Sequence, residues 1–282
     1  MQTNNPALVL LRGGGDLATG VALRLHRAGI PVIVSELEQP LAVRRTVSFA
    51  EAIYEGQQTV EGVIGRRVKP DQISASLNTK EIPVLVDPHA DILNIDLRPL
   101  TFVAVIDGRL TKQPPASLPV SVPLHIGLGP GFRAGVNCDA VIETRRSHTL
   151  GRVYWSGTTQ PDSGQPEGDR RRVLRAPANG VLTSQAKIGE HLEEGQAVAS
   201  IQVDKYTSSQ LRSPFAGVLR GLIHNGIHVT EGLKIGDVDP RDDPSACFLV
   251  SDKALAIGGA ALEAILAREE IRARLFHYEG LH

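Results

Sequence analysis

Short apolar runs alternate with amphipathic segments in the first half of the chain. Residues 7–11 are apolar without alternation, which is typical of a parallel strand that is buried on both faces. Residues 16–28 carry apolar side chains at helical spacing, and the following Gly29 and Pro31 are residues that end helices. Further apolar runs occupy residues 31–35, 82–86, 101–106 and 140–142. The alternation predicts an α/β domain with a parallel sheet over residues 1–150.

The second half of the chain contains an internal repeat. Residues 175–182 match residues 212–219, and further glycine, histidine and glutamate positions recur at the same offset of 37. Each copy has the pattern of short strands joined by glycine turns, so that two copies would close one core between them. This predicts an all-β domain over residues 151–240. The last segment, 241–282, contains a predicted helix over residues 251–276 that we expect to pack back on the first domain.

A glycine-rich turn follows the first predicted strand. Gly13, Gly15 and Ala18 fit the G-x-G-x-x-G/A spacing that brings backbone N–H groups and a helix N-terminus against a phosphate. The turn predicts a Rossmann-like, nucleotide-binding domain, in which Glu36 takes the place of the acid that binds a ribose. The whole turn is then a candidate for cofactor binding: Gly13, Gly14, Gly15, Asp16, Ala18 and Gly20. The alternative is a tight strand-to-helix connection that binds no ligand, and Asp16 would repel an anion unless it caps the helix or meets a cation.

Charged residues follow several of the predicted strands. Arg44 and Arg45 come shortly after the second strand, at the edge where open parallel sheets bind ligands, and are candidates to neutralise a phosphate. The carboxylates that follow later strands, Asp87, Asp107 and Glu143, are candidates to hold a cation such as Mg²⁺. The alternatives are a solvated arginine pair and acids that only form turns or caps.

Two further segments of the first domain are candidates for ligand contact. Gly127, Gly129 and Gly131 alternate in a loop that predicts a backbone wall against a ligand, although the lysine and serine or threonine of a phosphate-binding P-loop are missing. Residues 143–148 bring a carboxylate, guanidinium groups and an imidazole together, and we count Arg146 and His148 among the candidates. A loop histidine with a structural hydrogen bond is the alternative.

Composition narrows the class of protein. The net charge is −1, with 30 lysines and arginines against 31 aspartates and glutamates, which argues against a nucleic-acid partner or a membrane-surface role. No apolar run approaches the roughly 20 residues that span a bilayer, and a basic-then-apolar leader is absent from the N-terminus. Cys138 and Cys247 lie far apart without metal-type spacing, which fits a reducing compartment. We therefore expect a cytoplasmic protein.

Several motifs taken together resemble the YqeB family: residues 11–20, 43–49, 127–132, 141–144 and 234–241. These are accessory proteins of the selenium-dependent molybdenum hydroxylase system, similar in their Rossmann-like part to XdhC-type maturation factors. The repeat resembles biotinyl/lipoyl-like domains, which are barrel-sandwich hybrids. Lys205 lies where carrier versions display the modified lysine, but its flanking residues do not match, so neither biotin nor lipoate is expected.

The resemblance implies a maturation factor for a molybdenum hydroxylase, with that enzyme as its client and a phosphate-bearing ligand, molybdenum cofactor or a nucleotide, at the strand ends. The competing hypothesis is an enzyme: an NAD(P)-dependent oxidoreductase, or a nucleotidyl or sulfur transferase acting on the cofactor. Sulfur transfer would require a reactive thiol, for which Cys138 is the loop candidate. Two domains with a shared cleft are compatible with a monomer or a homodimer.

Overall fold

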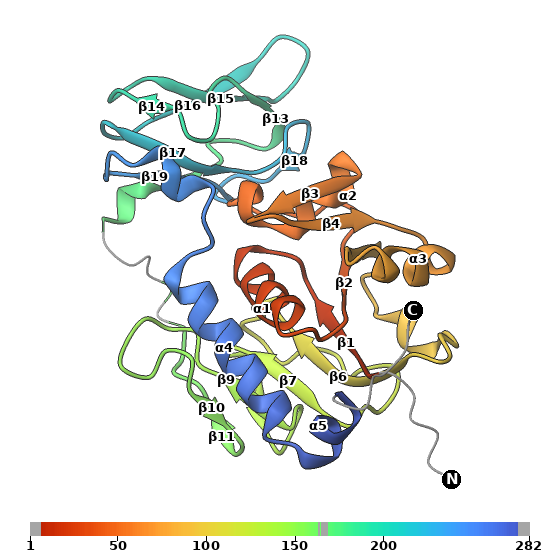
Figure 1. The fold of residues 1–282 in the computed structure, drawn as a ribbon. Helices are drawn as coiled ribbons and strands as arrows, with labels where there is room; N and C mark the ends of the chain where they lie inside the picture. The colour runs from red at the N-terminus through yellow and green to blue at the C-terminus, as the bar shows by residue number, and fades with distance from the viewer. Residues whose placement is uncertain (1–6, 163, 165–168, 276–282) are drawn as a thin grey trace.

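The fold is described from a computed structural model, in which residues 7–162, 164 and 169–275 are placed. The first part is built on a nine-stranded sheet (Figure 1). Its strands are β1 (Ala7–Arg12), β2 (Val32–Glu36), β3 (Gln57–Val60), β4 (Val63–Arg67), β5 (Ile82–Val86), β6 (Thr101–Asp107), β7 (His125–Leu128), β9 (Ala140–Ile142) and β10 (Val153–Tyr154). They lie in the order β10-β9-β7-β6-β1-β2-β5-β4-β3, and only the outermost pairs, β10–β9 and β4–β3, are antiparallel.

Strand β1 lies at the centre of this sheet, and its position explains why its sequence is continuously apolar. Val9 and Leu11 belong to the core on one face, whereas Leu8 and Leu10 belong to the core on the other, and all four are fully buried. Because side chains alternate between the two faces of a strand, a strand covered on both sides needs apolar residues at every position.

Helices cover the two faces. These are α1 (Asp16–Arg27), α2 (Ala52–Glu55), α3 (Ile73–Asn78), α4 (Asp252–Leu266) and α5 (Glu269–Leu275). Figure 1 shows α4 crossing α1 on one face of the sheet. The two helices come so close that a Cβ added to Gly20 would lie 2.6 Å from the carbonyl oxygen of Ala254. The C-terminal segment of the chain thus packs on the first part.

The second part is a β-sandwich of two four-stranded sheets, β12-β19-β17-β14 and β16-β15-β13-β18. Its strands are β12 (Val173–Arg175), β13 (Gly180–Ser184), β14 (His191–Leu192), β15 (Ala197–Gln202), β16 (Ser208–Arg212), β17 (Gly217–Leu222), β18 (His228–Val229) and β19 (Lys234–Asp239). A shift of 37 residues turns β13, β14 and β15 into β17, β18 and β19. Each sheet therefore contains strands of both copies, which explains why the repeat closes one shared core.

Two details differ from the expectations. The expected limit of the first domain at residue 150 is too early, because β10 pairs with β9 and the short β11 (Gly157–Thr158) pairs with β8 (Arg133–Ala134). The helix expected over residues 251–276 is divided into α4 and α5. Its expected last residue, Phe276, lies outside the described residues.

The two parts are in direct contact. Val43, from the segment after β2, packs on the sandwich core, and a Cβ on Gly221 would lie 2.6 Å from the Val43 carbonyl oxygen. Arg45 donates from Nε to the carbonyl oxygen of Leu222 at 3.1 Å. Figure 1 shows the sandwich above the α/β part, next to β3 and β4. A cavity between the two parts can therefore be walled by both.

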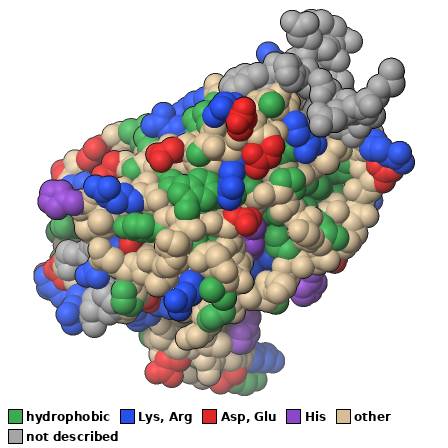
Figure 2. Space-filling model, turned by 90° about the horizontal axis from the view of Figure 1, so that it is seen from below, with side chains coloured by type: hydrophobic (Ala, Val, Ile, Leu, Met, Phe, Trp, Pro, Cys, Tyr) green, Lys and Arg blue, Asp and Glu red, His purple; other side chains and the backbone are tan. Residues whose placement is uncertain are grey.

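The surface has no dominant charge on the face seen in Figure 2, where basic, acidic and apolar side chains are interspersed. A nucleic-acid footprint would gather basic side chains on one face. Within the part of the chain that the structure describes, every helix is too short or too polar to cross a membrane.

Candidate functional site

A cavity of about 430 Å³ lies between the carboxyl ends of the central strands and the sandwich. The strand order reverses between β1 and β6, and in open α/β sheets this reversal is where ligands bind. Five basic side chains (Arg12, Arg44, Arg109, Arg220 and Lys234) and four acidic ones (Asp16, Glu36, Asp87 and Asp237) line the cavity. Its walls thus carry strong charge of both signs, with a small basic excess.

The glycine turn forms one wall, but Glu36 already occupies one of its donors. The Gly14 N–H donates to Glu36 Oε2 at 2.6 Å, and the Leu37 N–H donates to Oε1 at 2.8 Å. Burial raises the pKa of Glu36, while these two N–H groups act in the opposite direction. Glu36 does line the cavity, as expected, but its carboxylate caps the turn. Gly13 and Gly15 also line the cavity. Gly14 does not, and a Cβ added to it would lie 2.8 Å from the backbone nitrogen of Ala50.

The other two small residues of the turn have packing roles and do not line the cavity, contrary to expectation. A Cβ on Gly108 would lie 2.9 Å from the Cβ of Ala18, so Ala18 is the residue that lets the segment after β6 approach. Gly20 is the contact point of α1 with α4. The glycine pattern therefore serves helix packing as much as ligand approach.

A buried charge cluster stands beneath the cavity. Asp107, at the end of β6, is completely buried and accepts from Arg109 Nε at 2.9 Å and Nη2 at 2.6 Å, and from Arg12 Nη1 at 3.3 Å. Two guanidinium groups already neutralise Asp107, which disfavours the prediction that it holds a cation. Arg12 also donates to the Pro88 carbonyl oxygen, and burial lowers its pKa. The cluster fixes both arginines at the cavity wall.

The paired arginines of the sequence have separate tasks. Arg44 lines the cavity and donates from Nη2 to the carbonyl oxygens of Ala246 at 2.9 Å and Leu249 at 3.0 Å, and its Nη1 lies 3.9 Å from Asp16. Burial lowers the pKa of Arg44. Arg45 was expected to line the cavity but does not. It donates hydrogen bonds to Glu51 and to the carbonyl oxygen of Leu222 in the sandwich.

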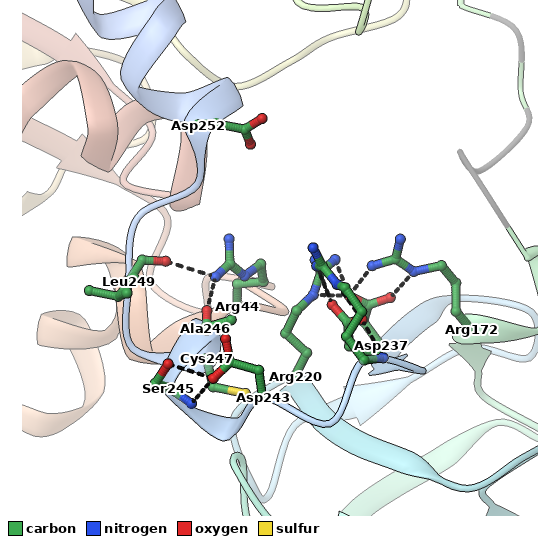
Figure 3. Close-up of polar contacts among 12 residues, drawn as sticks. Arg44, Arg172, Arg220, Asp237, Asp243, Ser245, Ala246, Cys247, Leu249 and Asp252 are labelled. Carbon is green, nitrogen blue, oxygen red and sulfur yellow. Dashed lines mark hydrogen bonds and ion pairs between the residues drawn. The ribbon is translucent and has the colours of Figure 1, made fainter.

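The sandwich supplies the opposite wall (Figure 3). Asp237 is nearly fully buried and accepts from Arg172 Nε at 2.9 Å and from Arg220 Nε at 2.6 Å. Lys234 forms no ion pair within 4 Å among the described residues, and partial desolvation lowers its pKa while Asp237 and Asp16 raise it. The ammonium group of Lys234 therefore remains available to an anion.

The other predicted cation ligands are occupied by backbone donors. Asp87 lines the cavity, but its two carboxylate oxygens accept from the N–H groups of Asp91 at 2.8 Å and Ile92 at 3.1 Å. Glu143 is buried and accepts from the N–H groups of Arg145 and Gln160. Asp87, Asp107 and Glu143 do not form a common site.

The second glycine loop and the segment after it lie away from the cavity. A Cβ on Gly127 would lie 2.0 Å from the ring of Phe132, and one on Gly131 would lie 2.4 Å from a carbonyl oxygen. Protein atoms therefore fill the space where a ligand was expected, and Gly129 lies against Thr144 in the same way. Arg146 forms a two-bond ion pair with Asp252 at the start of α4, and His148 is exposed. None of these five predicted residues lines the cavity.

One cluster was missed by sequence reasoning. Among the residues that the structure describes, the only three histidine, cysteine or acidic side chains close enough to share an ion are Glu51, Glu55 and His224. Arg45 donates to Glu51 at 3.0 Å, and His224 stacks on Tyr54 between the two parts of the molecule. Because Arg45 already neutralises Glu51, the cluster fits a contact between the parts better than a metal centre.

Five charged cavity residues were also absent from the expected site: Arg12, Arg109, Arg220, Lys234 and Asp237. Arg12 follows the end of one predicted strand and Arg109 follows the end of another. Because the carboxyl ends of parallel strands meet at one edge of a sheet, their positions in the sequence could have predicted both. The other three belong to the sandwich, and no local pattern links them to the first domain.

The surroundings of Cys138 and Cys247 do not favour a reactive thiolate at either position. Burial raises the pKa of Cys138 to about 11 and also raises the pKa of Cys247. Both side chains are buried. Because the thiolate is the nucleophile, these positions do not favour sulfur transfer.

Comparison with known proteins supports the similarities expected from the sequence. Residues 172–238 match the family described as biotin-requiring enzyme, which comprises biotin/lipoyl domains. The chain is 43% identical over 274 residues to the uncharacterized protein YqeB of Escherichia coli (strain K12), covering 94% of this chain and 49% of that protein. The chain thus spans about half the length of this curated relative.

The similarity of this chain to solved structures is weak. An aspartoacylase family protein from Mesorhizobium loti has 13% identity and a TM-score of 0.30, with 85% of this chain and 87% of that chain covered. The ectoine utilization protein EutE (DoeB) from Ruegeria pomeroyi has 10% identity and a TM-score of 0.27, with 83% and 85% covered. TM-scores this low do not indicate a shared fold.

Proposed function

We propose that the chain binds a small anionic molecule, bearing a phosphate or a similar group, in the cavity between the sheet and the sandwich. The observation that carries the proposal is the gathering of five basic side chains from both parts of the molecule around one cavity. Oriented guanidinium and ammonium groups are the side chains that recognise phosphate and carboxylate.

The donors that an anion needs are already in place. Nε of Arg12 and Nε of Arg44 are buried without a hydrogen-bond partner, and both side chains are more than nine-tenths buried. A buried donor without a partner costs about 1–3 kcal/mol. An anion in the cavity would lie beside the guanidinium groups of both arginines and the ammonium group of Lys234.

We further propose a Rossmann-like classification for the α/β part. Six of the seven parallel strands, β5-β2-β1-β6-β7-β9, have the order 3-2-1-4-5-6 of dinucleotide-binding folds when numbered among themselves. The seventh, β4, is an addition beyond β5, with which it pairs in parallel. The bond between Gly14 and Glu36 nevertheless favours a single anionic group further into the cavity over a pyrophosphate on the turn.

The biological role that we propose is that of a cytoplasmic accessory factor which holds a phosphate-bearing cofactor for a molybdenum hydroxylase. Its support is the resemblance of the motifs to the YqeB family, together with a site walled by both parts of the chain. An NAD(P)-dependent oxidoreductase or a nucleotidyl transferase is the alternative, and Glu36 would then favour NAD over NADP.

The test is thermal denaturation of the full chain with phosphate, NAD⁺, NADP⁺, ATP, CTP and molybdopterin-type cofactor, each with and without Mg²⁺. A ligand at 100 times its Kd stabilises the folded protein by about 2.7 kcal/mol.

Lys234→Gln should weaken binding of the stabilising anion about tenfold or more, because it removes a charged donor without breaking an ion pair. Lys187→Gln, an exposed lysine of the same sandwich, is the matched control.

The outcomes separate the hypotheses. A shift with molybdopterin-type cofactor alone supports the accessory role, and a shift with NAD⁺ alone supports the oxidoreductase. If no anion shifts the melting temperature, or if Lys187→Gln weakens binding as much as Lys234→Gln, the cavity is not an anion site.

The sandwich is expected to act as a wall of the site and not as a carrier of a prosthetic group. Lys205 lies in the turn between β15 and β16, where it contacts the ring of Tyr206. We predict that the intact mass of the protein equals that of the unmodified chain, 30.2 kDa, even when it is produced with biotin and lipoate supplied. An added mass that disappears in Lys205→Arg would contradict this prediction.

A further inference from the structure

A second cavity adjoins the proposed anion site. Its volume is about 550 Å³, and it lies at the carboxyl ends of β4 and β5. These strands run parallel to β2 and β1, so both cavities open on the same edge of the sheet. Asp87 lines both, which makes them neighbours along that edge.

Exposed apolar side chains gather along the two cavities. Val86 and Ile95 line the second cavity with 38% and 43% of their surface exposed. Leu37, Leu41 and Leu110 line the first and are also exposed. Five of the twelve large exposed apolar side chains of the described residues therefore lie in this groove. Apolar surface gathered in a concave site is typical of ligand pockets.

Four charged residues line the second cavity, and Lys69 and Asp91 among them are exposed to solvent. Both oxygens of Asp87 accept from backbone N–H groups, and Arg67 donates to the carbonyl oxygen of Ile53 at 2.8 Å. Its wall also includes the buried side chains of Leu85 and Ile92. The apolar wall of the second cavity is thus suited to an uncharged, apolar group, whereas the first cavity is suited to an anion.

We infer that the ligand has two parts, an anionic group held in the first cavity and an apolar body, such as an aromatic ring, held in the second. This inference rests on the proposed function, because the first cavity must bind the anion. It narrows the ligand class from any phosphate or carboxylate to an organic anion with an apolar body, and it assigns Val86 and Ile95 to recognition of that body.

The test compares phosphonates that share one anionic group. Isothermal titration calorimetry of the full chain would measure Kd for methylphosphonate, phenylphosphonate and 3-phenylpropylphosphonate. We expect at least one of the two aryl compounds to bind about tenfold or more tightly than methylphosphonate, because burial of a ring removes apolar surface from water. Its heat capacity change of binding should be more negative as well.

A charge introduced into the second cavity should remove the additional affinity for the aryl compounds and leave the affinity for methylphosphonate unchanged. We expect Ile95→Asp to bring the aryl phosphonates to the affinity of methylphosphonate, whose own Kd stays unchanged. Val136→Asp, which alters an exposed apolar residue outside both cavities, should leave all three affinities as in the unmodified chain.

Each failure has its own signature. Equal affinities for all three phosphonates, or a gain that survives in Ile95→Asp, would overturn the two-part ligand and leave the anion site intact. If none of the phosphonates binds, the anion site and the two-part ligand are both wrong.

Discussion

Asp107→Ala should lower the free energy of unfolding by about 3–5 kcal/mol. Asp107 is completely buried, and it is the counter-charge of Arg12, whose side chain is only 6% exposed, and of Arg109. Removing one partner of a buried ion pair leaves the remaining charge desolvated and uncompensated, which costs far more than the loss of a surface pair. Here two guanidinium groups would lose the carboxylate that holds them at the cavity wall.

Urea denaturation followed by the fluorescence of Trp155, the single tryptophan of the chain, would measure this loss in the α/β part. Asp96→Ala is the matched control, since it removes an aspartate that pairs with Arg98 on the surface, and it should change stability little. A loss below about 1 kcal/mol in Asp107→Ala would mean that water hydrates the arginines and that the cluster is not preorganised.

Gly258→Leu and Gly259→Leu should change stability in opposite directions although the residues are neighbours in α4. A Cβ on Gly258 would lie 2.5 Å from the carbonyl oxygen of Gly20, whereas a Cβ on Gly259 would have no atom within 4 Å. The first substitution forces α1 and α4 apart and should cost about 2–3 kcal/mol. The second replaces a poor helix former at an exposed position and should gain up to about 1 kcal/mol.

Thermal and urea denaturation of the two variants under the same conditions would measure both effects. Circular dichroism of the native states would show that each variant retains its helices. Equal effects of the two substitutions would contradict the close crossing of α1 and α4, and with it the packing role of Gly20.

The elements of the fold could be read from local patterns. The continuous apolar run of β1, the helical spacing of α1 and the repeat at 37 residues predicted a central parallel strand, its following helix and the paired sheets of the sandwich. Each of these depends on residues that are neighbours in the chain, since side-chain periodicity follows directly from the geometry of a strand or a helix.

The candidate site could be predicted only in part, because the partners of a side chain are chosen by the tertiary structure. Gly13, Gly15, Asp16, Glu36, Arg44 and Asp87 do line the cavity. The expected cation ligand Asp107 instead meets two arginines, and Glu143 meets backbone N–H groups. The sequence alone does not distinguish a strand-end carboxylate that is free to bind a ligand from one that is already paired with protein donors.

The sequence by itself thus determined five strands of the sheet, the first helix, the duplicated sandwich and the edge of the sheet where charged residues collect. Only the tertiary structure decided which of those charges remain available, and it added Arg220 and Lys234 from a part of the chain far from β1. The physical reason is that periodicity is a local property of the backbone, whereas desolvation and ion pairing depend on what packs against a group in space.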